Sequence, residues 1–460
     1  KNNLVVTGIS GGGSQGWDLP AADSRIKAAA AVAGASSLEG QIVQKTIDDH
    51  CDCMMPINTY GIDFSDIGAL IAPRPFMIAQ PNRDLYYSIE AVHTLFHKTK
   101  PIYSFYGKPE NLIMKDASGG HSYGSKEELR PEILAFFLKE LKGKNISPDK
   151  LGEIDTSLEL SEEALKAYVN GVPKDDRTKT IQDSFVELAS PPEINTVEQL
   201  DSYKNEVKAF LKEKTFGAFP EKPASLDMRL DFTSSSSSGN ERKDYSFVSE
   251  EGWRLKLSLQ SGQPTDNNQP LLLVLKNPNE ERYESAALVG GLRGKVIIAY
   301  FEARGIGETG WSQSEQWHIR RASAWTGRTI ASMRVYDVLR CLQALRSIPG
   351  VDTDNISILA QGEMAAIASY TALLDGNVKS LLIKDLPATQ NVPSDPTGKG
   401  EAIEMLNCLR VTDLPQVAGF QFPNQLVIIG SQPTTYDWAK ELYNNLDRPG
   451  AYKSIQKVSQ

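Results

Sequence analysis

The first 147 residues alternate short apolar runs with polar segments of helical spacing. Three runs predict strands, at 3–8, 25–34 and 74–81, and a fourth candidate strand lies at 101–107. Residues 125–143 repeat apolar side chains at helical intervals, which predicts a helix. Continuous apolar runs are typical of parallel strands buried on both faces. The pattern therefore predicts an α/β domain, but one with too few strands to close by itself.

A second α/β series begins near residue 229. The pattern predicts a hairpin over 245–262 and a long helix over 329–348. The further apolar runs, each expected to form a strand, start at residues 270, 295, 355, 378 and 425. We therefore expect two α/β domains with mostly parallel sheets, and this second series is complete where the first is not.

The segment 148–228 is acidic and helix-prone, and we interpret it as a helical connector. The expected organisation is therefore a first domain over 1–147, the connector, and a second domain over 229–460. The clearest break in the pattern is TSSSSSGNERKD, from Thr233 to Asp244. A serine run with glycine and charges is typical of a solvated loop, and no function is assigned to it.

The two series match at their centres. NLVVTGISGGGSQ (3–15) aligns with NISILAQGEMAAI (355–367), which sets Ser10 against Gly362. Both stretches have the pattern of a strand, a sharp turn and a helix, and a repeat this far apart indicates domain duplication. Several strands precede the turn in the second copy. We therefore expect the first domain to need an N-terminal half that is encoded upstream, has been removed, or is supplied as a separate chain.

Composition narrows the class of protein. The chain has 460 residues, a net charge of -9 and 40% hydrophobic residues, which is typical of a globular protein of two or three domains. The negative charge argues against nucleic acid or an anionic membrane as the main partner. No apolar run approaches the roughly 20 residues of a membrane-spanning helix. Four cysteines do not make a disulfide framework, and they leave the compartment open.

The candidate chemistry begins with Gly8-Ile9-Ser10-Gly11-Gly12, which fits the pattern G-x-S-x-G. A strained turn between a strand and a helix exposes the serine hydroxyl, and bulky side chains on either side would clash there. The backbone N–H of Gly11 lies at the helix N-terminus, where it could bind an oxyanion. The alternative is a glycine-rich turn without chemistry.

A serine in such a turn needs a base and an orienting acid, which follow in the chain order Ser, Asp or Glu, His. Asp84 comes just after the expected strand at 74–81, and it is preferred as the acid. His121 lies in a glycine-rich loop before the last helix of this domain, where it could reach back over the strand ends as the base. The alternatives are that Asp84 only caps the helix carrying Ile89 and His93, and that His121 is an exposed loop residue.

The remaining histidines predict neither a metal nor a cofactor. His93 and His97 have an i, i+4 spacing that also suits metal ligands, but no third ligand is evident, and a helix surface is the better interpretation. His50 lies in the segment DDHCDCMMPINTY (48–60), which could shape a pocket but holds no recognisable ligand set. In the second copy, Gly362 replaces the serine, Thr435 or Tyr436 falls near the acid position, and no histidine follows. We therefore predict that the second domain is inert.

Three stretches resemble one family. VTGISGGGSQGW (6–17), the segment 40–86 with HCDCM and ALIAPRP, and GGHSYGSKEELRPEILAFFLKEL (119–141) are similar to the α/β-hydrolase family of tandem bacterial esterases often labelled acetylxylan esterases. RGIGETGW and LAQGEMAA resemble the degenerate second domain of that family. The resemblance implies Ser10 as nucleophile, Asp84 as orienting acid and His121 as base, in a secreted or periplasmic enzyme that deacylates a saccharide. It also implies that the absent half held a second oxyanion donor.

Three functions are considered. The first is a serine carboxylesterase acting on acyl groups of a polysaccharide or oligosaccharide. The second is a serine peptidase of the prolyl-oligopeptidase type, which shares the residue order but usually has an aromatic residue where this chain has Gly11. The third is a non-catalytic, carbohydrate-associated binding protein, which suits the second domain better than the first.

Overall fold

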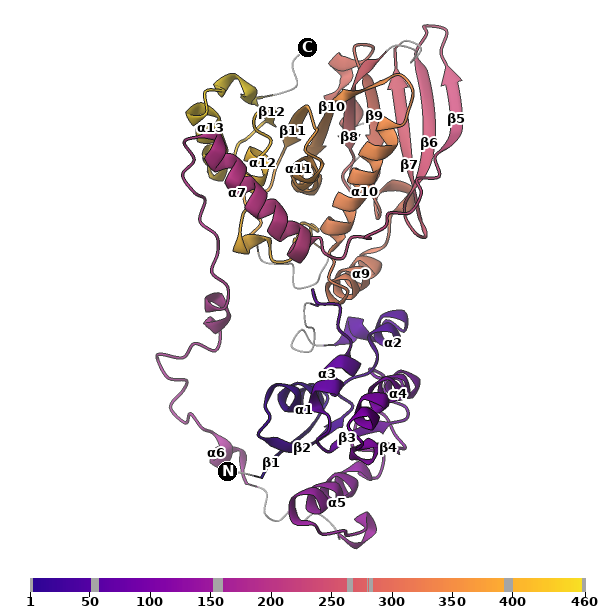
Figure 1. Ribbon diagram of the computed structural model, residues 1–460, viewed down its shortest axis with the longest axis vertical. Coiled ribbons are helices and arrows are strands. Elements are labelled where there is room, and N and C mark those ends of the chain that lie inside the picture. The colour runs from indigo at the N-terminus through magenta and orange to yellow at the C-terminus, as the bar shows by residue number, and fades with distance from the viewer. Residues whose placement is uncertain are drawn as a thin grey trace. The chain divides into compact units, whose positions relative to one another are not determined.

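The computed structural model describes residues 3–50, 58–151, 160–262, 268–278, 280, 284–392 and 400–456. The chain divides into two compact units, Lys1–Phe185 and Val186–Gln460 (Figure 1). Each unit contains a sheet with parallel strands and packed helices, which confirms the α/β class. Within the described ranges, no helix is long and apolar enough to cross a membrane.

The first unit is built on four parallel strands in the order β1-β2-β3-β4. They are β1 Leu4–Ile9, β2 Ile26–Val32, β3 Phe76–Pro81 and β4 Leu112–Ala117. The strand predicted at 101–107 is wrong. Those residues end helix α4 (Ile89–Phe105), which buries Val92, Leu95, Thr99 and Tyr103 on one helical face, and the fourth strand only follows at Leu112.

Helices cover both faces of this sheet. Helix α1 (Gly11–Ala22) packs on β1, β2 and α3 (Phe64–Ile71), and α3 packs on α4. Helix α5 (Leu129–Lys142) packs on β2, β3 and β4, and Figure 1 shows it across the strands from α1. Two short helices, α2 (Leu38–Val43) and α6 (Glu162–Leu165), complete the unit. Because both faces are covered, β3 is buried along its whole length.

Strand β1 forms one edge of the four-stranded sheet. Among the described residues it pairs with β2 and with no other strand. No residue of β1 is fully buried, and Leu4 is 44% exposed, in contrast to the buried run of β2. The outer side of β1 therefore presents open backbone donors and acceptors that another strand could pair with.

The second unit contains nine strands in the order β13-β12-β11-β10-β8-β9-β7-β6-β5. The six from β13 to β9 in this order are parallel, and β7, β6 and β5 continue the sheet in antiparallel pairs. The predicted hairpin is confirmed as β6–β7. The bounds are β5 Arg229–Ser235, β6 Glu241–Glu250, β7 Trp253–Ser261, β8 Gln269–Leu275, β9 Ile297–Phe301, β10 Val351–Gln361, β11 Ser380–Lys384, β12 Gln425–Ile429 and β13 Tyr452–Ile455.

The large core of this unit lies between the sheet and its helices. Helix α7 takes part through Leu200 and Val207, so the expected connector 148–228 is divided between the two units. A smaller cluster, including Leu272, Val274 and Ile298, lies on the opposite face. The helices are α7 Val197–Phe210, α8 Glu284–Leu288, α9 Gln313–Trp325, α10 Ile330–Arg346, α11 Glu363–Asp375, α12 Leu414–Gly419 and α13 Asp437–Asn445.

The serine-rich break is a β-hairpin, and its prediction as a loop is wrong at both ends. Residues up to Ser235 belong to β5, and those from Glu241 belong to β6, so that 236–240 alone make the turn. The turn closes when Ser236 donates its backbone N–H to the Asn240 carbonyl at 2.8 Å. Cross-strand pairing with β6 and β7 decides the conformation here, because strand preference depends on neighbours more than on composition.

The turns that align in the sequence have the same backbone. Ser10 has φ 59° and ψ -122°, and Gly362 has φ 56° and ψ -133°. Each donates its backbone N–H to the next parallel strand, Ser10 to Val32 at 3.1 Å and Gly362 to Lys384 at 3.0 Å. Strands β1 to β4 therefore have the arrangement of β10 to β13. In the second unit, β8 pairs with the side of β10 that corresponds to the open edge of β1.

Candidate active site

Ser10 occupies the turn between β1 and α1. Its φ of 59° lies in a region that residues with a side chain rarely adopt, which indicates local backbone strain. Helix α1 begins at the next residue. The backbone N–H of Gly11 is therefore one of the first amides of the helix, which have no acceptor within it. The turn places a strained serine beside a helix N-terminus.

The two glycines of the motif act in different ways. A Cβ atom on Gly8 would lie 2.5 Å from the carbonyl oxygen of Gly12, too close for any side chain. A Cβ atom on Gly12 would meet nothing within 4 Å. The expectation that a side chain would clash is therefore confirmed at Gly8 and wrong at Gly12. Gly12 contributes through its backbone, which packs against Gly8.

This difference gives a matched pair of variants. Gly8→Ala is expected to lower the free energy of unfolding by about 1–3 kcal/mol, because the backbone of Gly12 must move away. Gly12→Ala is expected to leave stability unchanged or raise it by up to about 1 kcal/mol, because Ala favours a helix over Gly. Urea unfolding followed by circular dichroism measures both. Equal losses for the two variants would contradict the packing described.

Asp84 and His121 are joined by a hydrogen bond. His121 Nδ1 lies 2.7 Å from Asp84 Oδ2, and the Asp84 side chain is fully buried. The other oxygen, Oδ1, accepts the backbone N–H groups of Tyr86 at 2.8 Å and Tyr87 at 3.1 Å. The carboxylate is therefore fixed through both oxygens. The alternative that Asp84 only caps α4 is wrong, because Ser88 is the N-cap of that helix.

Backbone hydrogen bonds tie together the loops that carry these two residues. Asn82 donates its N–H to the Ala117 carbonyl at 2.9 Å, and Arg83 donates its N–H to the Gly119 carbonyl at 2.9 Å. Gly119 has φ 133°, a conformation that favours glycine, and it begins the loop into His121. The imidazole is thus held beside Asp84 by the backbone as well as by its own hydrogen bond.

The structure places the three predicted residues after strand ends on one edge of the sheet. Ser10 follows β1, Asp84 follows β3 and His121 follows β4, and the carboxyl ends of parallel strands meet at a common edge. His121 Nε2, on the far side of the ring from Asp84, is buried and has no hydrogen-bond partner among the described residues. Asp84 and His121 are in direct contact, whereas no hydrogen bond is recorded between His121 and Ser10 in the part of the chain described.

One aromatic ring packs directly against the imidazole, and other rings lie close to that one. The Tyr86 ring packs edge-on against His121, with ring centroids 4.8 Å apart, and the His50 ring lies 4.9 Å from that of Tyr87. His50 therefore borders the site, while Cys51 and Cys53 lie outside the described residues. Sequence reasoning missed Tyr86. The sequence signal for Tyr86 was its position two residues after Asp84. From there its backbone N–H reaches the Asp84 carboxylate and its ring reaches His121.

The other histidines of this unit have different surroundings. His93 Nε2 lies 3.2 Å from Asp116 Oδ2, and its side chain is 45% exposed, which confirms its interpretation as a helix-surface residue. His97 is also exposed. Over the ranges that the structure describes, no three side chains of His, Cys, Asp or Glu are arranged to hold a metal ion.

The corresponding turn of the second unit has different side chains around it. A Cβ atom on Gly362 would lie 2.7 Å from Nδ2 of Asn277, whose Oδ1 accepts the Met364 N–H at 3.3 Å. The next residue, Glu363, is buried in an ion pair with Arg334, which is also buried. A side chain at position 362 would therefore require Asn277 to move, and beside the turn lies a hollow of about 220 Å³ lined by Asn277, Glu363 and other acidic residues.

Comparisons with known proteins give matches in structure. No family model matches the chain, and no curated protein matches it. A Bacteroides fragilis protein provisionally assigned as an acetyl xylan esterase has 11% identity and a TM-score of 0.46 over 56% of this chain and 74% of its own. A glucuronoyl esterase from Solibacter usitatus has 11% identity and a TM-score of 0.42, over 57% and 87%.

A third match is an acetyl xylan esterase from Paenibacillus sp. R4, with 14% identity and a TM-score of 0.37 over 58% of this chain and 90% of its own. All three are named as esterases. Every TM-score is below 0.5. The chemistry assigned to this chain therefore rests on the geometry of its own residues.

Proposed function

We propose that the first unit carries the active site of a serine carboxylesterase that removes acyl groups, acetyl in particular, from a polysaccharide or oligosaccharide. The observation that carries this proposal is the 2.7 Å bond between the buried Asp84 carboxylate and His121 Nδ1, at the sheet edge where Ser10 is strained. Nucleophile, acid and base in this chain order are the arrangement of α/β-hydrolases. The proposal that the alcohol part of the ester is a saccharide rests on the sequence resemblance. A saccharide substrate suits a secreted or periplasmic protein.

In this mechanism Ser10 Oγ attacks the ester carbonyl while His121 Nε2 accepts the hydroxyl proton. Asp84 accepts a hydrogen bond from Nδ1–H, which fixes the tautomer that leaves Nε2 free and stabilises the imidazolium once it forms. His121 then returns the proton to the departing sugar alcohol. Water attacks the acyl-enzyme with the same histidine as base, and the free acid and Ser10 are released.

The oxyanion of each tetrahedral intermediate is proposed to bind the backbone N–H of Gly11. This fold normally supplies a second donor from a loop on the other side of the nucleophile strand. We propose that a parallel apolar strand pairs with the open edge of β1, in the same way as β8 pairs with β10. The segment that contains this strand is proposed to supply the second oxyanion donor. Loss of one such donor costs about 3–4 kcal/mol of transition-state stabilisation.

The second unit is proposed to be a degenerate copy of the first. Its turn at Gly362 has the same backbone as the turn at Ser10, but it has no serine, and Asn277 lies where a side chain at this position would begin. In the sequence no histidine follows this turn, so a base in the position of His121 is missing. The role of the second unit is then either to bind a ligand or to stabilise the first unit.

A fluorophosphonate probe tests the proposed function. The probe is expected to label one serine, and peptide mapping is expected to place it at Ser10, because a serine needs a neighbouring base to react. Acetylated xylan and a prolyl peptide, offered to the labelled and unlabelled protein, then distinguish an esterase from a peptidase. Release of acetate that labelling abolishes is the expected result.

Two outcomes would contradict this proposal. Cleavage of the prolyl peptide without release of acetate would favour the peptidase alternative. Absence of any labelled serine, in a preparation whose circular dichroism shows folded protein, would favour a non-catalytic binding protein.

A further inference from the structure

The second unit has a hollow on the face of its sheet that is turned away from the large core. Alternate residues of β7 divide between the two faces, with Leu255, Leu257 and Leu259 buried in the core and Lys256 and Ser258 on the other side. The hollow has a volume of about 530 Å³, within the range of small-molecule sites. It extends from β5 across β6 and β7 to β9, and residues of α8 together with Arg293 close one side.

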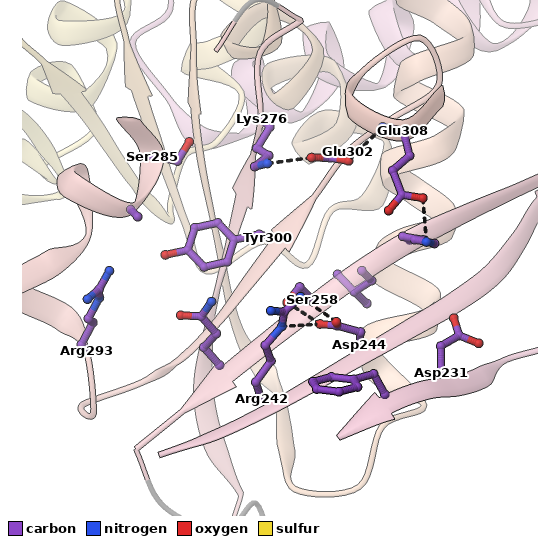
Figure 2. A pocket seen from close by; sticks show the side chains of 15 residues that line it. Asp231, Arg242, Asp244, Ser258, Lys276, Ser285, Arg293, Tyr300, Glu302 and Glu308 are labelled. Carbon is purple, nitrogen blue, oxygen red and sulfur yellow. Dashed lines mark hydrogen bonds and ion pairs between the residues drawn. The ribbon is translucent and has the colours of Figure 1, made fainter. Parts of the chain in front are cut away.

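Six of the eight charged side chains that line this hollow form ion pairs with one another. Arg242 forms a bidentate pair with Asp244, at 2.9 and 2.7 Å, and Ser258 Oγ donates to the same carboxylate at 2.7 Å. Lys276 Nζ lies 2.6 Å from Glu302 (Figure 2). Lys256 pairs in the same way with Glu308, and the remaining charges of Asp231 and Arg293 have opposite signs. The wall is rich in donors and acceptors but has no net charge.

Two aromatic side chains interrupt this polar wall. Figure 2 shows Tyr300 between Arg293 and the Arg242–Asp244 pair. Burial raises the pKa of Tyr300, so its hydroxyl remains protonated and able to donate a hydrogen bond. Phe232 of β5 is 48% exposed, and the Arg242 guanidinium lies 5.6 Å from the centre of its ring. Ring faces beside fixed polar groups suit a ligand that has both flat apolar faces and many hydroxyls.

We propose that this hollow binds a neutral oligosaccharide. A sugar ring places C–H groups on its faces and hydroxyls around its rim, which match the rings and the paired side chains respectively. The ion pairs hold Arg242, Asp244, Lys276 and Glu302 in place, so little side-chain entropy is lost on binding. An anionic ligand would meet as many carboxylates as cations. This site is separate from the proposed active site and does not require Ser10 to react.

Binding is tested on the full chain carrying Ser10→Ala, so that no ligand is hydrolysed. Isothermal titration calorimetry with xylohexaose, cellohexaose and mannohexaose is expected to show saturable binding of at least one of them. A hexamer of galacturonic acid is expected to bind more weakly than that neutral ligand. Adding Phe232→Ala is expected to weaken binding about tenfold, because a stacked ring face is lost.

Leu230→Ala is the matched control. Leu230 lies on the same edge strand and is 54% exposed, but it pairs with Tyr245, whose side chain packs on the large core, whereas Phe232 pairs with Asp244 in the hollow. A bulge between Leu230 and Phe232 places them on opposite faces. This variant is expected to bind as tightly as the parent.

Three results would overturn the proposal: no binding of any neutral hexasaccharide, tighter binding of the galacturonic acid hexamer, or an affinity that Phe232→Ala leaves unchanged. If Phe232→Ala leaves the affinity unchanged, the saccharide binds at another place, for example at the proposed active site. Reaction of Ser10 with the fluorophosphonate is measured separately, so the failure of one proposal can be told from the failure of the other.

Discussion

Ser10→Ala is expected to lower ester hydrolysis by about four to six orders of magnitude, the scale observed when a nucleophilic serine is removed. Alanine retains the Cβ atom and removes only the hydroxyl, so the turn at φ 59° should be kept. Release of acetate under saturating substrate measures the loss. Near-parental activity in this variant would exclude Ser10 as the nucleophile.

Ser10→Gly is the informative companion to this variant. Glycine adopts positive φ without cost, whereas a serine in this conformation stores about 1–3 kcal/mol of strain. We therefore expect Ser10→Gly to be as inactive as Ser10→Ala and more stable than the parent by about 1 kcal/mol in urea unfolding. An inactive variant with lowered stability would point to loss of the fold instead of loss of the nucleophile.

His121→Ala is expected to be nearly as damaging as Ser10→Ala, because the nucleophile then has no base. Asp84→Asn is expected to lower turnover by about 10⁴-fold, since an amide can donate to Nδ1 and favour the wrong tautomer. The buried position of Asp84 and its three hydrogen bonds make this a local change of charge at nearly constant shape. Turnover of acetate esters near neutral pH measures both effects.

The double variant tests whether Ser10 and His121 act together in catalysis or contribute to the rate independently. Ser10→Ala with His121→Ala is expected to be no slower than either alone, because residues that act together lose their effect together. His93→Ala is the control, since His93 is 45% exposed and bonds Asp116 instead of Asp84. Multiplied losses in the double variant, or a large loss in the control, would contradict the assigned roles.

The sequence alone determined the elements whose pattern is local. The buried strands β2 and β3 were predictable because both of their faces are covered, so nearly every residue is apolar. The serine turn was predictable because Gly8 has no room for a side chain, a constraint that must be written in the sequence. The order Ser10, Asp84, His121 followed from the same reasoning, since each comes after a strand end or opens a loop.

Local pattern failed where partners distant in the chain decide the conformation. Residues 101–107 have the composition of a strand, but residues 101–105 continue α4, which buries Tyr103 on the same face as Leu95 and Thr99. The serine run from Thr233 resembles a loop, but pairing between β5 and β6 makes most of it a hairpin. In both cases the secondary structure is determined by contacts with residues too distant in the sequence for a local pattern to show them.

The contacts that give the site its chemistry were also decided by tertiary structure. The bond between Asp84 and His121 spans 37 residues and depends on adjacent loops after β3 and β4, which Arg83 and Gly119 join. The hollow near Tyr300 joins side chains from four strands, β5, β6, β7 and β9. The sequence determined which residue types could act. Only the sheet, by bringing separate strand ends and faces together, determined which of them meet.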